Sequence, residues 1–266
     1  MRVLVATPCA LGMVHNQYLL SFIETYNWAM KHRQEIAQQL ITQAQGRNDP
    51  EVVQAIQNTM HRHTYEIGLY TMAGESLLPR ARNHCAQVCL TQGWDKLFFI
   101  DADTHWTAQD FKAVLEANLP LIGGVVPLKT YVDFPRSFKT SLNYLPFLED
   151  EKYFDRSLRT LESTVKMAQG HANAIVKVAF TGTAFLCIDR SVLLKMAETA
   201  SEYLYPSPTT GQVETHWSFF DGGPLENIYL SEDWSFVHKA RELGFDCHIN
   251  TNVRLGHVGN HHFVAG

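Results

Sequence analysis

Two aspartates follow directly on an apolar run in the segment LFFIDADTHW, residues 97–106. Asp101 and Asp103 are separated by one alanine, and carboxylates so close repel each other unless a cation or a shared proton relieves the repulsion. Hard divalent cations such as Mg²⁺ and Mn²⁺ prefer oxygen ligands of this kind. The pattern leaves three interpretations open: a metal site, a nucleophilic carboxylate, or a surface loop that ends at a helix cap at Thr107.

A second acidic pair, Glu232 and Asp233, lies in the segment LSEDWSF. The longer stretch LSEDWSFVHKARELGF has a strong helical pattern, so both carboxylates fall in the first turn of a predicted helix. Acidic residues there complement the helix dipole, with Ser231 as the cap. The alternative interpretation is catalytic, with a general base poised to take a proton from an acceptor hydroxyl.

Two further segments carry candidate ligand-binding residues. VRLGHVG places His257 between two glycines at the end of a predicted strand, either as an additional metal ligand or as a structural histidine. PRARNH places Arg80, Arg82 and Asn83 where a helix begins after a loop. Guanidinium groups there suit phosphate or nucleotide recognition, and the alternative is an ordinary solvated helix face.

The elements that would position these residues alternate along the chain. Short apolar runs bounded by turn residues alternate with helical patterns, which favours a mixed α/β fold with a mainly parallel sheet. Ligands bind beyond the carboxyl ends of the strands in such sheets, and Asp101 and Asp103 fall at such an end. The first half of the chain predicts the strands RVLVATP, YEIGLYTM, KLFFI and LIGGVVPLK, and the helices 16–44, EVVQAIQNTMHRH, LLPRARNHCAQVCLTQ and TAQDFKAVLEAN.

The second half of the chain is less regular. AIVKVAFTGTAFLCIDRSVLLKMA predicts a strand, a glycine turn, a second strand and a helix, and DCHINTNVRLGHVG predicts a final strand pair. Residues 131–173 have no firm period and predict a flap or a helical excursion. Residues 205–227 predict an exposed loop, whose aromatic residues near Trp217, Phe219 and Phe220 would line an acceptor site or pack in the interior.

Composition limits the class of protein. The chain has 266 residues, of which 45% are hydrophobic and 18% charged, and its formal charge of −5 argues against a broad electropositive surface for nucleic acid. Five cysteines without a CxxC pair favour a reducing cytoplasm over a disulfide framework. No apolar run approaches about 18 residues, so we expect no membrane span, and MRVLVATPCALGM predicts a core strand rather than a signal peptide.

Six motifs occur in order over about residues 74–259: PRARN, LFFIDAD, LIGGVVPLK, FTGTAFLCIDR, SEDWSF with ELGF behind it, and LGHVG. Together they resemble nucleotide-sugar glycosyltransferases of the GT-A fold, most closely the family-2-like enzymes common in bacterial and phage genomes. The resemblance implies one α/β domain over residues 1–266, a Rossmann-like three-layer sandwich with a mainly parallel central sheet. Residues 29–63 and 131–173 match nothing in the pattern and would be insertions.

The resemblance also implies roles for the candidate residues. Asp103 would bind Mn²⁺ or Mg²⁺ and, through it, the diphosphate of the sugar donor, and His257 would be a late metal ligand. Asp101 would contact the metal or the ribose. Asp233 would be the catalytic base of an inverting enzyme, with Glu232 beside it, although the stereochemistry stays open. The donor nucleotide and its phosphates would lie against Thr7, Pro8, Arg80, Arg82, Asn83, Asp101 and Lys129.

The partners implied are a nucleoside-diphosphate sugar and an acceptor hydroxyl. The acceptor would belong to a glycan, a protein or, in a phage enzyme working in the host cytoplasm, a modified DNA base. The unassigned segment concentrates basic charge that would either track DNA phosphates or form a solvated helix face. These basic residues are Lys129, Arg136, Lys139, Arg156, Arg159 and Lys166.

Two other functions fit parts of the pattern. IDADTH resembles the motif of haloacid-dehalogenase-type phosphatases, in which Asp101 would be the nucleophile and Asp103 the acid and base, with Thr181, Lys195 and Asp233 as the later groups. That motif normally follows the first strand, whereas about a hundred residues precede it here. The other function is a non-catalytic module that binds glycan or nucleic acid and whose acidic cluster only holds Ca²⁺.

Overall fold

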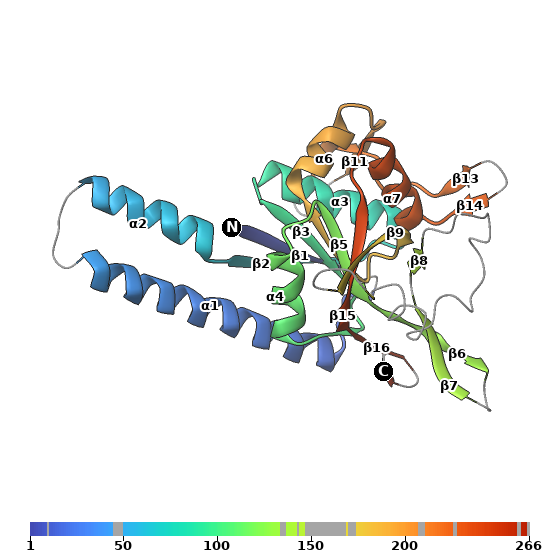
Figure 1. The fold of residues 1–266 in the computed structure, drawn as a ribbon. Coiled ribbons are helices and arrows are strands. Elements are labelled where there is room, and N and C mark those ends of the chain that lie inside the picture. Colours follow the sequence, from blue (N-terminus) through green and yellow to red (C-terminus); the bar gives the residue numbers. More distant parts are fainter. Residues whose placement is uncertain are drawn as a thin grey trace.

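The structure is a computed structural model. It describes residues 1–9, 11–44, 50–133, 137–142, 144–146, 169, 174–206, 211–225, 228–259 and 262–264. A central sheet of eight strands organises this part of the chain (Figure 1). Its strands in spatial order are β2 (Glu66–Ala73), β1 (Arg2–Cys9), β3 (Lys96–Ile100), β10 (Phe185–Asp189), β5 (Leu121–Val125), β15 (Cys247–Arg254), β9 (Ile175–Thr181) and β8 (Tyr144–Pro146).

Most strands of this sheet run in one direction. The β2–β1, β1–β3 and β5–β15 pairs are parallel, and β3 and β5 both pair antiparallel with β10, so β2, β1, β3, β5 and β15 share one direction. β9 runs against its neighbour β15. The prediction of an α/β fold with a mainly parallel central sheet is therefore confirmed.

Helices cover both faces of the sheet because the central strands are apolar on both faces. In β3 every side chain is buried, and Leu97 and Phe99 join a different core cluster from Phe98 and Ile100. The first cluster packs against α3 (Leu78–Thr91), α6 (Arg190–Ala197) and α7 (Glu232–Glu242). The second packs against α4 (Ala108–Glu116) and the start of α1 (Asn16–Ala44), which gives three layers.

Two glycines allow the neighbouring strands at the centre of the sheet to pack closely against β5. A Cβ on Gly123 of β5 would lie 2.8 Å from the Phe185 carbonyl oxygen, and one on Gly124 would lie 2.6 Å from Val253 Cγ1. Real Cβ atoms do not approach so closely, so the strand needs residues without side chains here.

A long helical hairpin of α1 and α2 (Pro50–His63) extends away from the sheet (Figure 1). Both helices occur where the sequence predicts them. The Trp106 backbone N–H donates to Ser21 Oγ over 3.0 Å, and the Trp106 indole N–H donates to Thr25 Oγ1 over 2.8 Å. These contacts fix the first turns of α1 to the segment between β4 (Thr104–His105) and α4.

Two predicted strand segments divide between sheets. LIGGVVPLK predicts one strand, but the structure divides it into β5 and β6 (Pro127–Asp133), and β6 pairs with β7 (Ser137–Leu142) in a separate ribbon. Proline cannot donate to a sheet ladder, which agrees with a break at Pro127. The final strands also separate, because β16 (Gly256–Val258) pairs with β4 (Thr104–His105) and β17 (His262–Val264) rather than with β15.

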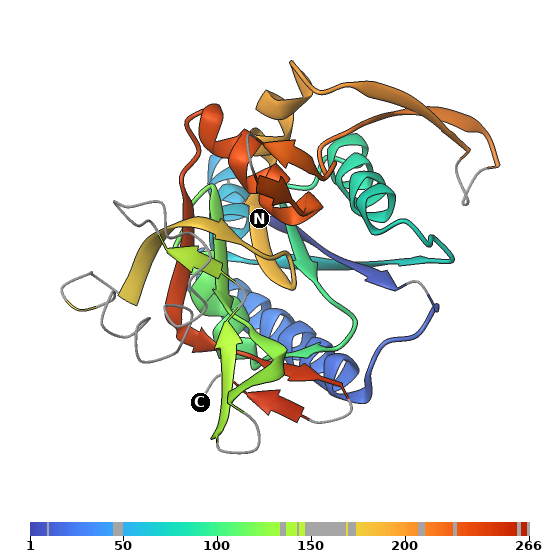
Figure 2. The same ribbon diagram turned by 90° about the vertical axis from the view of Figure 1, so that its right-hand side faces the viewer.

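The prediction of an exposed loop over residues 205–227 is wrong. The chain there forms strands, and Phe219 and Phe220 are fully buried in the core beside α3 and α7. The β11–β12 ribbon reaches out over α3 (Figure 2). The strands of this region are β11 (Glu202–Pro206), β12 (Val213–Trp217), β13 (Gly223–Leu225) and β14 (Ile228–Leu230).

The prediction for residues 131–173 falls largely outside the described residues, as do Arg136, Arg156, Arg159 and Lys166. In the part that the structure describes, this region contributes the last three residues of β6, and all of β7 and β8. None of the described helices is both long enough and apolar enough to cross a membrane.

Candidate active site at the carboxyl edge of the sheet

The D-x-D segment follows β3, as predicted, and backbone bonds fix it. The Asp101 N–H donates to the Ala184 carbonyl oxygen over 3.2 Å, and the Thr104 N–H donates back to the Asp101 carbonyl oxygen over 3.0 Å. The chain then enters β4, and Thr107 caps α4 with the reciprocal bonds of a capping box to Asp110. The structure therefore contains both the turn with the two aspartates and the helix cap at Thr107, so the presence of the cap does not decide between the interpretations of the D-x-D segment.

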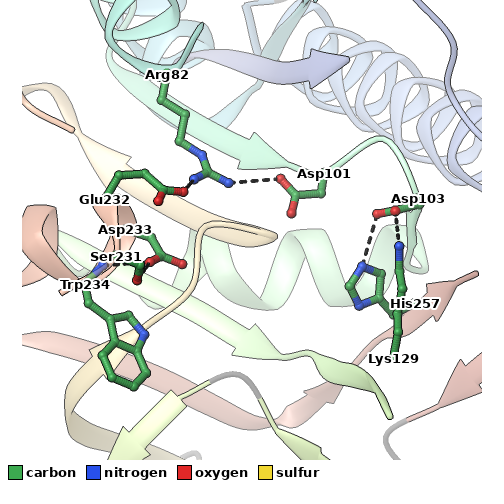
Figure 3. Close-up of polar contacts among 9 residues, drawn as sticks. All are labelled: Arg82, Asp101, Asp103, Lys129, Ser231, Glu232, Asp233, Trp234 and His257. Atoms are coloured by element: carbon green, nitrogen blue, oxygen red, sulfur yellow. Dashed lines mark hydrogen bonds and ion pairs between the residues drawn. The ribbon is translucent and has the colours of Figure 1, made fainter. Parts of the chain in front are cut away.

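Asp103 and His257, which are 154 residues apart, meet at this edge. Asp103 Oδ1 and His257 Nε2 are 3.1 Å apart, and the other Asp103 oxygen accepts from the Lys129 ammonium group (Figure 3). The pairing of β16 with β4 brings them together, and the Val258 N–H donates to the Asp103 carbonyl oxygen over 2.8 Å. Burial alone would raise the pKa of the Asp103 carboxyl, but His257 and Lys129 outweigh it and lower the pKa to about 2.

The chemistry of this pair suits a cation. His257 Nδ1 lies 2.9 Å from the Pro127 carbonyl oxygen, a contact in which only an N–H on Nδ1 can donate. In the neutral ring Nε2 is then an acceptor that faces a carboxylate oxygen, and only a proton or a metal ion between them relieves that contact. Asp103 and His257 supply an oxygen and a nitrogen of the kinds that divalent cations bind, but the described residues contain no group of three His, Cys, Asp or Glu side chains placed for one.

Asp101 turns toward a different partner. Arg82 of α3, only 3% exposed, lies 3.5 Å from Asp101 Oδ1 and donates to Glu232 with its other terminal nitrogen (Figure 3). Its Nε has no hydrogen-bond partner within the described residues. A buried guanidinium therefore connects the end of β3 to the beginning of α7.

Asp233 lies beside this ion pair. Its Oδ1 accepts from the Ser231 hydroxyl and, over 2.8 Å, from the Trp234 N–H. Ser231 is the N-cap residue of α7, as expected, but its side chain forms no capping hydrogen bond, because the hydroxyl donates to Asp233 instead. Burial raises the pKa of the Asp233 carboxyl, although Arg82 and the Ser231 hydroxyl oppose the shift.

The other predicted nucleotide-binding residues have contacts within the protein. Arg80 forms an ion pair with Glu75 over 2.6 Å, and Asn83 Oδ1 accepts from the Phe219 and Phe220 N–H groups. The buried Thr7 shares a hydrogen bond of 2.5 Å with Tyr18 of α1. Pro8 lies in β1 beside Met72 of β2.

The sequence interpretation missed two residues at or near this edge. Trp234 follows the acidic pair and stacks on Phe180 with ring centroids 5.2 Å apart. Glu75 is buried and accepts from Arg80, the Leu77 N–H and, over 3.3 Å, the Tyr205 hydroxyl. The spacing of Trp234 next to two acids was a usable signal, whereas Glu75 depends on β11 and no local pattern indicates it.

Fold and site together define an α/β protein with a mainly parallel sheet and acidic groups at its carboxyl edge. No family model and no curated protein matches the chain. Among solved structures, A197 from STIV is 12% identical with a TM-score of 0.46, covering 97% of this chain and 86% of that one. Apo UDP-glucose pyrophosphorylase is 9% identical with a TM-score of 0.37, covering 94% and 90%. These likenesses are too distant to identify an activity.

Proposed function

We propose that this protein is a metal-dependent glycosyltransferase that moves a sugar from a nucleoside-diphosphate donor to an acceptor hydroxyl. The observation that supports it best is the 3.1 Å contact between Asp103 and His257 at the end of β3. Arg82 forms ion pairs with Asp101 and Glu232, and Asp233 is the residue next to Glu232. In metal-dependent sugar transfer, a cation stabilises the diphosphate leaving group and a proton acceptor activates the acceptor hydroxyl.

Each side chain has a defined task in this proposal. Asp103 and His257 hold Mn²⁺ or Mg²⁺, which when bound stabilises the charge that develops on the departing diphosphate. Lys129 adds a positive charge beside Asp103, where it can meet a phosphate oxygen.

Asp233 accepts the proton of the acceptor hydroxyl in this proposal, and its raised pKa makes it a stronger base than an exposed aspartate. Glu232 holds Arg82, which keeps α7 and the D-x-D turn in register. The acceptor belongs to a glycan, a protein or a modified DNA base.

The geometry argues against the phosphatase alternative. β10 runs antiparallel to β3 with Asp189 opposite Lys96, so α6 begins at the amino edge of the sheet, away from Asp101. Lys195 near the end of α6 pairs with Glu198 instead of approaching the D-x-D turn. Lys195, the lysine that the phosphatase pattern assigns to the site, therefore does not lie beside Asp101.

A thermal-shift panel of sugar nucleotides, each with and without Mn²⁺, tests the proposal. A donor that binds only the native state raises its apparent stability, by about 2.7 kcal/mol at a hundredfold excess over Kd. We expect a shift that requires both donor and metal in the wild-type chain, and none in Asp103→Asn. Asp246→Asn, which changes an exposed aspartate at the amino edge of the sheet, is the matched control and should respond like the wild type.

Two results would count against the proposal. One is a panel in which no sugar nucleotide stabilises the chain with or without Mn²⁺. The other is donor binding that persists unchanged in Asp103→Asn. Phosphate release from p-nitrophenyl phosphate, lost in Asp101→Asn, would favour the phosphatase instead.

A further inference from the structure

Helix α1 carries a second apolar stripe that no described element covers. Its body-facing side buries Tyr18, Ser21, Thr25 and Ala29. On another side of the helix Leu19, Ile23, Tyr26 and Met30 are 47%, 46%, 43% and 40% exposed. Solvent-exposed leucine and isoleucine at such regular positions are unusual for a helix that already has a buried face.

The spacing of the stripe is that of a helix–helix seam. Leu19, Ile23, Tyr26 and Met30 follow one another at intervals of four, three and four residues, which is the a/d pattern of a coiled coil. α1 lies along one margin of the molecule, with α2 on its other side (Figure 1). A second helix can therefore approach α1 lengthwise.

We infer that this stripe is a dimerisation surface, on which α1 of a second copy of the chain packs antiparallel. In that arrangement Leu19 faces Met30 of the partner copy and Ile23 faces Tyr26, so each contact occurs twice about a two-fold axis. The stripe is thus complementary to itself. This inference is independent of the proposed enzymatic function.

Charge favours a second copy over a membrane. Between residues 11 and 30 the only Asp, Glu, Lys or Arg is Glu24, about 100° or more around α1 from the stripe residues. Two copies of a chain with a net charge of −5 can therefore meet along the four stripe residues, none of which is charged. A helix that lies on a membrane carries Lys and Arg along its polar face, and this stretch has none.

The exposed apolar area suits a dimer of ordinary size. Three further exposed apolar residues lie near the stripe in the sequence: Leu20, 66% exposed, and Leu11 and Met13, 82% and 67% exposed, in the segment leading into α1. At about 100 Å² of apolar surface per fully exposed side chain, these seven residues present about 400 Å². An interface is roughly 60% apolar, so a contact that buried all seven side chains would cover about 700 Å² per copy, near the roughly 800 Å² of a standard interface.

Sedimentation equilibrium of the full chain over a hundredfold range of concentration tests the inference. We expect the wild type to dimerise, and Ile23→Asp to weaken the dimer on the order of a hundredfold, because two charges enter the seam. Leu194→Asp is the matched control, since Leu194 of α6 is also 46% exposed but lies outside the stripe. Met30→Asp repeats the test, and circular dichroism checks that each variant folds.

Cross-linking determines the direction of the pairing. All five native cysteines are buried, so a cysteine placed on α1 is the accessible thiol. With a short bis-maleimide, a mixture of Leu19→Cys and Met30→Cys chains should cross-link, and either variant alone should do so much less. Strong Leu19→Cys self-cross-linking would overturn the antiparallel arrangement.

Three further outcomes would overturn the dimer itself. The chain stays monomeric throughout the concentration range, or it dimerises equally well with Ile23→Asp. In the third, the monomer binds neutral phosphatidylcholine vesicles and Ile23→Asp abolishes that binding, which would assign the stripe to a lipid surface.

Discussion

The two key carboxylates of the site have opposite electrostatic surroundings. Asp103 faces His257 and Lys129, which keep it ionised, whereas burial raises the pKa of Asp233 and makes it a better proton acceptor. Pairs of acids whose pKa values are separated in this way divide the tasks of binding and proton transfer. The proposed roles, Asp103 as a ligand of the cation and Asp233 as the base for the acceptor hydroxyl, rest on this difference.

The substitution Asp233→Asn should remove transfer and stabilise the protein. In the folded wild type, burial raises the pKa of the Asp233 carboxyl above the unfolded value of about 3.9. The wild-type chain therefore loses stability as the pH rises through the folded pKa. The Asp233→Asn variant lacks this loss, so its free energy of unfolding in urea at pH 7 should exceed that of the wild type. Both chains should converge near pH 3, where the wild-type carboxyl is protonated in both states.

Transfer by Asp233→Asn should fall by about 10²–10⁴ while donor affinity stays unchanged, since a general base acts on the acceptor. Asp246→Asn is again the control. Full turnover in Asp233→Asn would remove Asp233 from the base role. A loss of stability at pH 7 would mean that the ionised carboxylate stabilises the start of α7.

At the scale of elements, helices were the easier prediction because their signals are local. Residues 16–44 form α1 as predicted, and Thr107 caps α4 through atoms within three residues of it. Strands were harder where a continuous apolar run crosses from one sheet to another. β5 and β6 show this, because the pairing partners of each lie far away in sequence.

Removal of the α4 cap should destabilise the protein modestly. Thr107→Ala loses the side-chain acceptor for the Asp110 N–H, which should lower the free energy of unfolding by about 1 kcal/mol. Thr107→Ser keeps the hydroxyl and serves as the control in urea denaturation. Equal losses in the two variants would mean that the Thr107 methyl group, rather than the cap, stabilises α4.

At the scale of the whole molecule, charged contacts outside the site join distant segments. Glu75, between β2 and α3, accepts from Arg80 and from Tyr205 of β11. Burial would raise the pKa of the Glu75 carboxyl, but these donors and the Leu77 N–H outweigh it and lower the pKa below its ordinary value. The contact therefore contributes stability only while Glu75 is ionised.

This sign gives a pH prediction for global unfolding. Because the folded pKa of Glu75 is depressed, its contribution is complete above the unfolded value of about 4.3 and is lost as the pH falls through the folded pKa. Glu75→Gln should lower the free energy of unfolding at pH 7 by about 1–3 kcal/mol. It should also flatten the decline of stability below about pH 4, as measured by urea unfolding across pH. An unchanged acid profile would contradict the depressed pKa.

The sequence alone determined the features that depend on residues close together along the chain. The period of its apolar residues predicted most of the helices and strands, and the position of Asp101 and Asp103 after KLFFI predicted the edge at which they lie. Tertiary structure decided which strands are neighbours, that β10 and β9 run against the others, and that Phe219 and Phe220 are core residues.

Tertiary structure also decided how the site is assembled. His257 reaches Asp103 only because β16 pairs with β4, and Arg82 links Asp101 to Glu232 only because α3 and α7 pack on one face. Such contacts join residues about 20 to 150 positions apart. Local propensity carries no information about them, since they form when burial of the whole core fixes the layers.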